Sequence, residues 1–185
     1  IEELLSGIIR RYATTVIMAT HDMTQGQRLA DRIGVLMDGE LLQTGSAKDI
    51  FTSPRNREVA EFVGVENIID GVIISSEDNV VTIDSGGRFI EAISDYAAGD
   101  EVCVCIRPED ITLALSPISS SARNSFEGKI TWAVTMGPLA RVEIDCGFPL
   151  VAMVTKRSAE EMGLTKGKMV YAAFKATGVH VIKKN

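Results

Sequence analysis

Residues 15–64 read TVIMATHDMTQGQRLADRIGVLMDGELLQTGSAKDIFTSPRNREVAEFVG, and this stretch indicates a mixed α/β segment. The apolar run from Val16 to Ala19 predicts a short strand that delivers Thr20-His21-Asp22 to its carboxyl end. The pattern from about Thr24 to Ile33 predicts a helix, and Asp38-Gly39 predicts the tight turn of a hairpin. A strand, a helix and a hairpin therefore follow one another within some thirty residues.

Further helices are predicted after the hairpin and before the segment. Ser46 and Asp49 have the spacing of a capping box, which predicts the start of a short helix. A last helix is expected from Asn56 to Val63, and Gly64 supplies the residue that closes it. Before the segment, the apolar residues between Glu2 and Tyr12 recur on one helical face and predict an amphipathic helix. Helices largely stop at Gly64.

From Glu66 onward the sequence changes to short β-rich runs separated by Gly and Pro. The runs are residues 68–74, 80–84, 89–93, 101–106, 111–115, 129–135, 140–145, 150–154, 169–174 and 179–182. Many short strands at close spacing predict a small barrel, interrupted by one helical turn over residues 158–162. The serine-rich stretch 116–121 is interpreted as the connection between two lobes. A flexible linker is the alternative, but six residues are too few to separate domains.

Composition narrows the classes of protein. The net charge of −6 argues against a surface for nucleic acid or anionic lipid, and no run of about 18 apolar residues is available to span a membrane. No segment has the layout of a signal peptide. Three cysteines are an odd number, so we expect no disulfide framework and a reducing, cytoplasmic compartment. Cys103 and Cys105 should face the same side of a strand as small buried hydrophobes. A metal site there would have only His21 and His180 as partners, and no metal is expected.

Residues 15–64 strongly resemble the end of the nucleotide-binding domain of ABC transporter ATPases, with ADRIGVLMDGELLQTGSAKDIF and NREVAEFVG typical of importers. The resemblance implies that His21 contacts the γ-phosphate of ATP, with Mg²⁺, in a full-length protein. The phosphate loop G-x-x-x-x-G-K-[ST] is missing, Leu5-Ser6-Gly7 is not continued as the family's signature, and no Asp-Glu pair precedes it. We therefore expect a carboxyl-terminal piece of an ATPase that hydrolyses nothing by itself.

The second half carries a further resemblance. The sequence IRPEDI at residues 106–111 resembles the β-barrel domain that follows the ATPase in sugar, sulfate and metal-oxyanion importers. The ordered series SARN at 121–124, GKI at 128–130, VTKRS at 154–158, GL at 163–164, Gly167 and FKA at 174–176 resembles the Mop-type molybdate-binding domain. The expected fold is an α/β remnant of an ABC ATPase domain (1–64) followed by an all-β, OB-like barrel of the Mop/TOBE type. Its lobes are expected at 65–119 and 120–185.

A tetrahedral oxo-dianion offers only acceptors, so its pocket needs hydroxyls, backbone N–H groups and cations. The resemblance implies that Ser121 and Ser158 donate hydroxyls, that the backbone around Ala122 helps, and that Arg123 and Lys175 neutralise the charge. The residues of second rank are Asn124, Thr155 and Lys156.

Structural alternatives exist for several of these residues. Arg123 could be an ordinary surface residue, and Asn124 could cap or turn the chain. Ser158 could be a helix N-cap, a role that is compatible with binding an anion. Lys175 falls in a strand-like run, where a charge is unexpected if both sides are packed, and this favours a function.

The resemblance also implies partners and a role. The two halves of the site come from different subunits in the family, so we expect a homodimer through the barrel, attached to membrane-embedded permease subunits at the inner face of the membrane. Bound molybdate or tungstate, which the sequence cannot distinguish, would inhibit uptake. One alternative is a ligand-free barrel that binds partner proteins, as in sugar importers. A second is a sulfate or other anion importer, against which SARN argues. Residues 1–64 argue against a free-standing storage protein.

Overall fold

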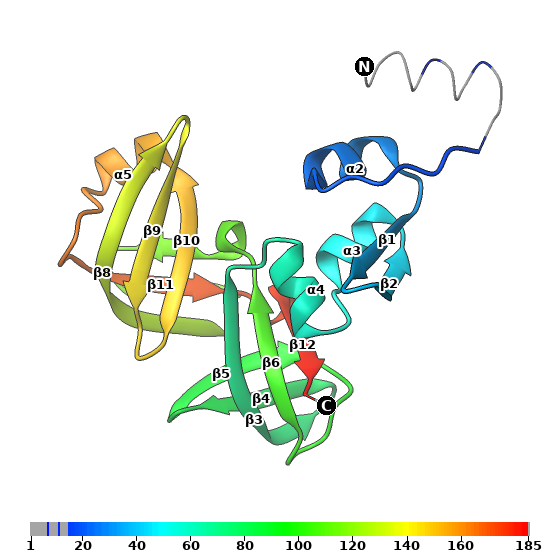
Figure 1. Cartoon of the computed structure of the whole chain (residues 1–185). Coiled ribbons are helices and arrows are strands. Elements are labelled where there is room, and N and C mark those ends of the chain that lie inside the picture. The colour runs from blue at the N-terminus through cyan, green and yellow to red at the C-terminus, as the bar shows by residue number, and fades with distance from the viewer. Residues whose placement is uncertain (1–6, 8–10, 12–14, 185) are drawn as a thin grey trace. The chain divides into compact units, whose positions relative to one another are not determined.

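The computed structural model describes Gly7, Arg11 and residues 15–184 (Figure 1). The helix predicted over residues 2–12 and the Leu5-Ser6-Gly7 triplet fall, apart from Gly7 and Arg11, outside the described residues. The chain forms two compact units, one up to Arg55 and one from Asn56 onward. In the described part of the chain, no helix is long and apolar enough to cross a bilayer.

The first unit combines helices with one hairpin. Its elements are α2 (Met23–Leu29), β1 (Ile33–Met37), β2 (Glu40–Gly45) and α3 (Ala47–Thr52). The predicted turn between β1 and β2 is confirmed: Asp38 and Gly39 both have positive φ, at 50° and 85°. Such a turn matches the twist of the two strands, and Asp-Gly favours it. The predicted capping box is also confirmed, because Ser46 Oγ accepts from Asp49 N at 3.1 Å and Ser46 N donates to Asp49 Oδ2 at 3.2 Å.

Two expectations for this unit are wrong. Residues 16–19 form no strand in the described structure, and Ile17 is 97% exposed. A strand needs neighbouring strands to pair with, and none of the described strands lies beside this segment. The predicted helix over 24–33 ends at Leu29, because Ala30 is extended at its C-cap and Ile33 already begins β1.

The second unit is mostly β-structure with few helices. Its elements are α4 (Arg57–Phe62), β3 (Asn67–Glu77), β4 (Val80–Ser85), β5 (Arg88–Ile93), β6 (Glu101–Ile106), η1 (Pro108–Asp110), β7 (Thr112–Ala114), β8 (Asn124–Met136), β9 (Leu139–Asp145), β10 (Pro149–Thr155), α5 (Lys156–Glu161), β11 (Met169–Phe174), η2 (Ala176–Gly178) and β12 (Val179–Lys183). Helix α4, which the sequence assigned to the first domain, lies in this unit and starts at its N-cap Asn56. Every predicted β-run after Glu66 overlaps an observed strand.

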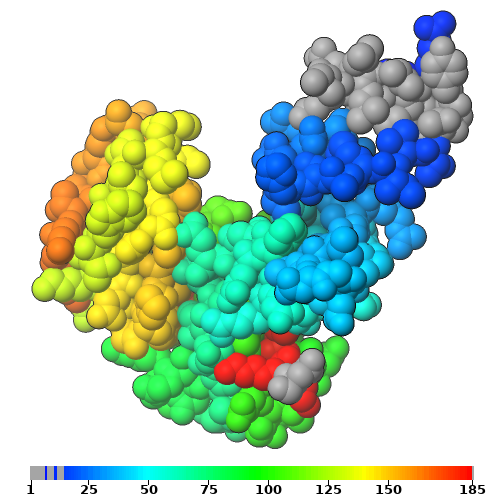
Figure 2. All heavy atoms as spheres, viewed as in Figure 1, coloured from blue at the N-terminus to red at the C-terminus, as the bar shows by residue number. Residues whose placement is uncertain are grey.

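The strands form two curled antiparallel sheets that exchange one strand each. The first sheet has the order β12-β6-β3-β4-β5, and the second has the order β10-β9-β8-β11-β7. β7 precedes the serine-rich connection but pairs with β11, while β12 ends the chain and pairs with β6. Figures 1 and 2 show the red C-terminal strand among the green segments of the first sheet. The two lobes are therefore interlocked.

The two sheets are built from an internal duplication. β3 begins NIIDG at Asn67 and β8 begins NSFEG at Asn124, and the strands that follow have the same order in each sheet. Each half ends in a strand, a 3₁₀ turn (η1 or η2) and the exchanged strand. Glycine is required at the same place in both. A Cβ on Gly71 would lie 2.5 Å from Ile83 Cγ2, and one on Gly128 would lie 2.5 Å from Cys146 Sγ.

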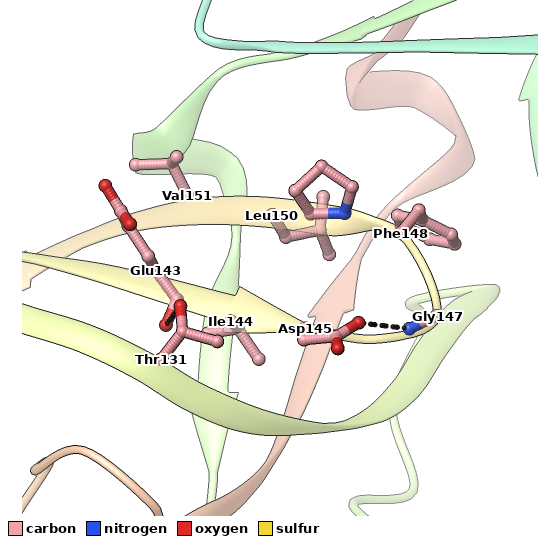
Figure 3. A pocket seen from close by; sticks show the side chains of 9 residues that line it. Thr131, Glu143, Ile144, Asp145, Gly147, Phe148, Leu150 and Val151 are labelled. Carbon is pink, nitrogen blue, oxygen red and sulfur yellow. Dashed lines mark hydrogen bonds between the residues drawn. The ribbon is translucent and has the colours of Figure 1, made fainter.

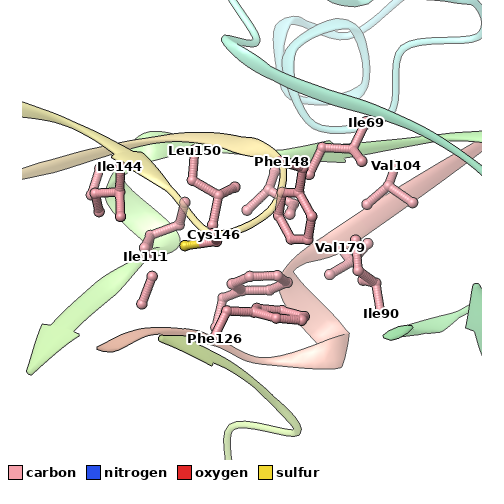
Figure 4. Packing of buried hydrophobic residues seen from close by; sticks show 14 of the residues in the cluster. Ile69, Ile90, Val104, Ile111, Phe126, Ile144, Cys146, Phe148, Leu150 and Val179 are labelled. Carbon is pink, nitrogen blue, oxygen red and sulfur yellow. The ribbon is translucent and has the colours of Figure 1, made fainter. Parts of the chain in front are cut away.

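One hydrophobic core joins the sheets (Figure 4). Phe126 of β8 packs edge-on against Phe148, with ring centroids 5.1 Å apart, and stacks on Phe174 at 5.9 Å. Such aromatic pairs add about 0.5–1.5 kcal/mol each to the burial of their area. As expected, Cys103 and Cys105 share one side of β6 as buried free thiols, packed with Ala60 and Ile182. α4 is thereby attached to the β-structure.

Candidate functional site

Five of the expected site residues lie together at one end of the second sheet, and we call them the Arg123 cluster: Ser121, Ala122, Arg123, Asn124 and Lys175. Asn124 begins β8 and is paired with Phe174, the last residue of β11. Arg123 and Lys175 therefore stand next to each other just beyond the ends of two hydrogen-bonded strands. Both side chains are exposed. Two adjacent cations can attract an anion to this end of the sheet.

Asn124 has a structural task within the cluster. It is 1% exposed, and its Oδ1 accepts from Glu91 N at 2.8 Å while its Nδ2 donates to Glu91 O at 2.9 Å. It neither caps a helix nor makes a turn. Because Glu91 lies in β5, the side chain of Asn124 joins the second sheet to the first. Asn67 does the same in the other half: Val151 N donates to Asn67 Oδ1 at 2.6 Å, and Asn67 Nδ2 donates to Val151 O at 2.9 Å.

Arg123 forms an ion pair with Glu91. Arg123 Nε donates to Glu91 Oε2 at 2.8 Å, and Nη2 donates to Oε1 at 3.4 Å. The hydrogen bond that Arg123 donates to this carboxylate is the main cause that raises the pKa of Arg123 above its ordinary value. The side chain of Arg123 is 66% exposed, whereas that of Glu91 is 27% exposed. Exposed pairs of this kind contribute little to stability, so the guanidinium can exchange partners at little cost.

The other members of the cluster are placed as follows. Ser121 is exposed, and Ala122 N donates to Ser120 Oγ at 3.2 Å, so an incoming anion would have to displace that hydroxyl. Lys175 follows β11 and occupies the N-cap position of η2. The argument from a packed strand is therefore wrong for Lys175, because the side chain is in solvent. Within the described residues, Lys175 has no acidic side chain within salt-bridge distance, which leaves its charge available.

Thr155, Lys156 and Ser158 lie together at the start of α5, and we call them the Ser158 cluster. The helix begins two residues earlier than predicted, because Thr155 rather than Ser158 is its N-cap: Thr155 Oγ1 accepts from Ser158 N at 3.1 Å. The two hydroxyls lie 2.8 Å apart. Lys156 Nζ is 3.8 Å from Glu160 Oε1. The cluster thus offers two neighbouring hydroxyls and one cation.

One chain does not bring the two clusters together. The Arg123 cluster lies where β8 begins, and Thr155 pairs with Leu139, which in turn pairs with Met136 at the other end of β8. β8 is 13 residues long, so its ends lie roughly 40 Å apart along the strand. Figure 1 shows α5 beside the β8–β9 turn, away from the start of β8. Each cluster alone holds only part of the expected set of donors.

His21 is exposed in the first unit, among residues that start a helix. Its neighbour Asp22 is the N-cap of α2 and accepts from Gln25 N at 3.1 Å, while Thr20 Oγ1 accepts from Asp22 N at 3.0 Å. These bonds make Thr20-His21-Asp22 a helix-starting turn. The role of His21 at a nucleotide stays a prediction for a longer protein.

A separate hollow lies beside the β9–β10 hairpin and contains none of the expected site residues (Figure 3). Glu143 and Asp145 line it together with apolar side chains, and Asp145 Oδ1 accepts from Gly147 N at 2.9 Å. Two carboxylates without a lining cation do not suit an oxyanion. Among the described residues, no group of three or more His, Cys, Asp or Glu side chains is arranged to hold a metal ion.

The sequence did not indicate the contact of Glu91 with Arg123. It also did not indicate that Asn67 and Asn124 join the two sheets through side-chain hydrogen bonds. Their signal was the repeated N-x-x-[DE]-G motif at 67–71 and 124–128, which marks equivalent positions in two halves. A buried polar residue that starts both halves needs hydrogen-bonding partners in the other sheet.

Comparison with known proteins gives this geometry a family context. Residues 120–181 match the TOBE domain family. The chain is 36% identical over 173 residues to the molybdate/tungstate import ATP-binding protein WtpC of Pyrococcus horikoshii, covering 93% of this chain and 48% of that protein. It is 31% identical over 180 residues to the spermidine/putrescine import ATP-binding protein PotA of Desulfitobacterium hafniense, covering 97% and 48%. The chain spans about half the length of the curated relatives it matches.

A solved structure is similar as well. The cytoplasmic molybdate-binding protein ModG, solved with molybdate bound, superposes with a TM-score of 0.60 and 26% identity over 64% of this chain and 96% of that one. The matching part of ModG is thus nearly its whole chain. The β-structure described above is therefore a ModG-like fold that includes a TOBE domain.

Proposed function

We propose that this chain, which contains a TOBE domain and is homologous over most of its length to a molybdate/tungstate import ATP-binding protein, binds molybdate or tungstate and regulates an importer. The observation that carries the proposal is the pair of clusters at opposite ends of β8. One offers Arg123, Lys175 and Ser121, and the other offers Thr155, Lys156 and Ser158. Together they supply the hydroxyls and cations that a tetrahedral dianion requires.

The site is completed by a second copy of the chain. Because one chain holds its two clusters apart, the Arg123 cluster of one copy would meet the Ser158 cluster of the other in a symmetric dimer with two equal sites. Occupancy would then favour the dimeric arrangement that slows ATP-driven import by cytoplasmic ATPase domains and membrane permeases. Regulation of this kind needs a ligand that prefers the inhibited arrangement, with typical couplings of about 1–3 kcal/mol.

Calorimetric titration of the 185-residue chain with molybdate, tungstate and sulfate tests the proposal. We expect saturable binding of molybdate and tungstate and weaker binding of sulfate, since a smaller anion leaves some donors out of reach. The absence of saturable binding for all three anions would end the oxyanion proposal.

A second candidate function is a regulatory barrel that takes no anion and contacts partner proteins. Two observations favour it: the likeness to spermidine/putrescine import proteins, and the existing ion pair between Arg123 and Glu91. This candidate predicts that substitution of Arg123 or Lys175 has no effect on any oxyanion titration.

A further inference from the structure

We propose that Glu91 is a built-in competitor that occupies Arg123 when no anion is bound and so weakens oxyanion binding at the Arg123 cluster. The inference rests on the proposed function and concerns the regulation of that same site. It begins from the two contacts of Glu91 with Arg123, at 2.8 Å and 3.4 Å, which engage two nitrogens of the guanidinium. A carboxylate in this position uses the same donors that a tetrahedral anion would need.

Glu91 is held in place more firmly than its partner. Its backbone N–H and C=O are both bonded by the buried side chain of Asn124, and it is paired with Thr82 in the ladder between β4 and β5. Arg123 precedes β8 and is the more exposed partner. An arriving anion therefore draws Arg123 away from Glu91, while the carboxylate stays where it is.

The competition affects affinity in a defined direction. The apparent affinity of a site falls by the fraction of time in which it is competent to bind. If Arg123 spends about four-fifths of its time on Glu91, the apparent affinity is about fivefold lower. The released carboxylate also stays close to the bound dianion and repels it. Both effects raise the anion concentration at which the site fills. A site of lower affinity responds only when the anion is abundant, which suits feedback regulation better than storage.

Glu91→Gln tests the proposal, because it removes the charge and keeps the shape of the side chain. Molybdate is titrated calorimetrically into the whole chain. We expect this variant to bind at least about fivefold more tightly than the wild type. Glu77→Gln is the matched control: Glu77 is exposed at the end of β3, so the same change of net charge should alter affinity less than about twofold. Thermal unfolding of each variant establishes that it is folded.

The gain should require Arg123. In an Arg123→Ala background, Glu91→Gln should change affinity less than about threefold, because the competition is gone and only the repulsion between the carboxylate and the anion is removed. Equal gains in both backgrounds would overturn the competition, since Glu91 would then act only as a nearby charge. Should Glu91→Gln misfold, Glu91→Asp serves instead, because its carboxylate is one methylene short of the guanidinium and should also bind more tightly.

The outcomes separate this inference from the proposed function. If the wild type binds molybdate and Glu91→Gln binds equally or more weakly, the competitor is refuted and the oxyanion site stands. If Glu91→Gln binds where the wild type does not, the competitor is supported, but the proposed oxyanion function of the wild-type chain has failed. If neither protein binds, the oxyanion function itself has failed.

Discussion

Asn67 and Asn124 are equivalent residues in the two halves of the β-structure, and each reaches from its own sheet to the backbone of the other. Asn67 bonds both backbone groups of Val151 in β10, and Asn124 bonds both backbone groups of Glu91 in β5. β5 and β10 are the edge strands of their sheets. A reciprocal pair of side chains therefore fastens each edge strand to the opposite sheet.

We expect Asn67→Ala to lower the free energy of unfolding by about 2–4 kcal/mol, because the N–H and C=O of Val151 lose their partner. Asn124→Ala should cost about 1–3 kcal/mol, since it makes two such bonds and Asn67 makes three. Urea unfolding measures both. Ser125→Ala, at an exposed position beside Asn124, is the control and should cost less than about 0.5 kcal/mol. Equal losses of stability at all three sites would contradict a role of Asn67 and Asn124 in joining the sheets.

The glycines of the duplicated motif should be intolerant of a methyl group. Gly128→Ala would place its Cβ 2.5 Å from Cys146 Sγ and 2.9 Å from Asp145 O, and overpacking of this kind costs about 1–3 kcal/mol or more. Gly178→Ala is the control, because its Cβ would meet Asp110 only at ordinary distances of 3.8–3.9 Å. Chemical unfolding should show a large loss for the first variant and a loss below about 0.5 kcal/mol for the second. Similar losses would mean that the close approach is relieved by backbone movement.

The free energy of unfolding should decrease at alkaline pH, because the buried thiol of Cys105 ionises more readily in the unfolded chain. Burial raises the pKa of Cys105 to about 12. Because the folded pKa is higher than the unfolded one, the contribution of this thiol is complete below about pH 9 and is lost as the pH rises toward 12. By pH 11 the loss is about 2–3 kcal/mol, at 1.36 kcal/mol per pH unit. The difference in unfolding free energy between the wild type and Cys105→Ala should narrow between pH 8 and 11. Parallel curves would contradict this prediction.

Local sequence patterns predicted most elements of the second unit. Turn residues and apolar alternation determine turns and strands through interactions between residues close in sequence. The prediction for β8 began at Lys129, whereas the strand begins at Asn124. Asn, Ser and Glu have low strand propensity, but pairing with β11 overrides it. The exchange of β7 and β12 was not predicted, because the choice of partner strand depends on contacts distant in sequence.

For the candidate site, the sequence supplied residue types but not their positions in space, and the binding role of these residues stays a prediction. Motif resemblance gave Arg123 and Ser158 as members of one set, and nothing local indicates that they lie at opposite ends of β8. The sequence offered no reason to single out Glu91, because an acidic residue in a strand is usually just exposed to solvent. Its significance comes from a hydrogen-bonded contact between residues 32 positions apart.

Removal of a charged donor should reduce molybdate affinity more than removal of a neutral donor. Arg123→Ala or Lys175→Ala removes a charge-assisted bond, for which we expect a loss of about 1.5–3 kcal/mol, or roughly 10- to 150-fold in molybdate affinity. Ser121→Ala and Ser158→Ala should cost nearer 1 kcal/mol each. Calorimetry at two salt concentrations measures the order. A nonspecific basic patch would instead lose affinity evenly across the variants and fade with salt.

The shared site can be tested by complementation between two defective chains. Arg123→Ala damages one cluster, and Ser158→Glu damages the other by placing a carboxylate against the anion, at a position near the start of α5 where an acidic residue suits the helix. Each variant dimer alone should bind molybdate at least about tenfold more weakly than the wild type. Co-expression with two different tags allows the mixed dimer to be isolated.

In that mixed dimer, the intact Arg123 cluster of one chain meets the intact Ser158 cluster of the other, and the two damaged clusters meet at the second site. One molybdate should therefore bind per mixed dimer with wild-type affinity, against two for the wild type, because a two-fold interface creates each site twice. If both clusters instead served a site within one chain, each chain of the mixed dimer would carry one defect and no tight site would form. Calorimetric stoichiometry distinguishes the two arrangements, and a mixed dimer without tight binding would exclude the shared site.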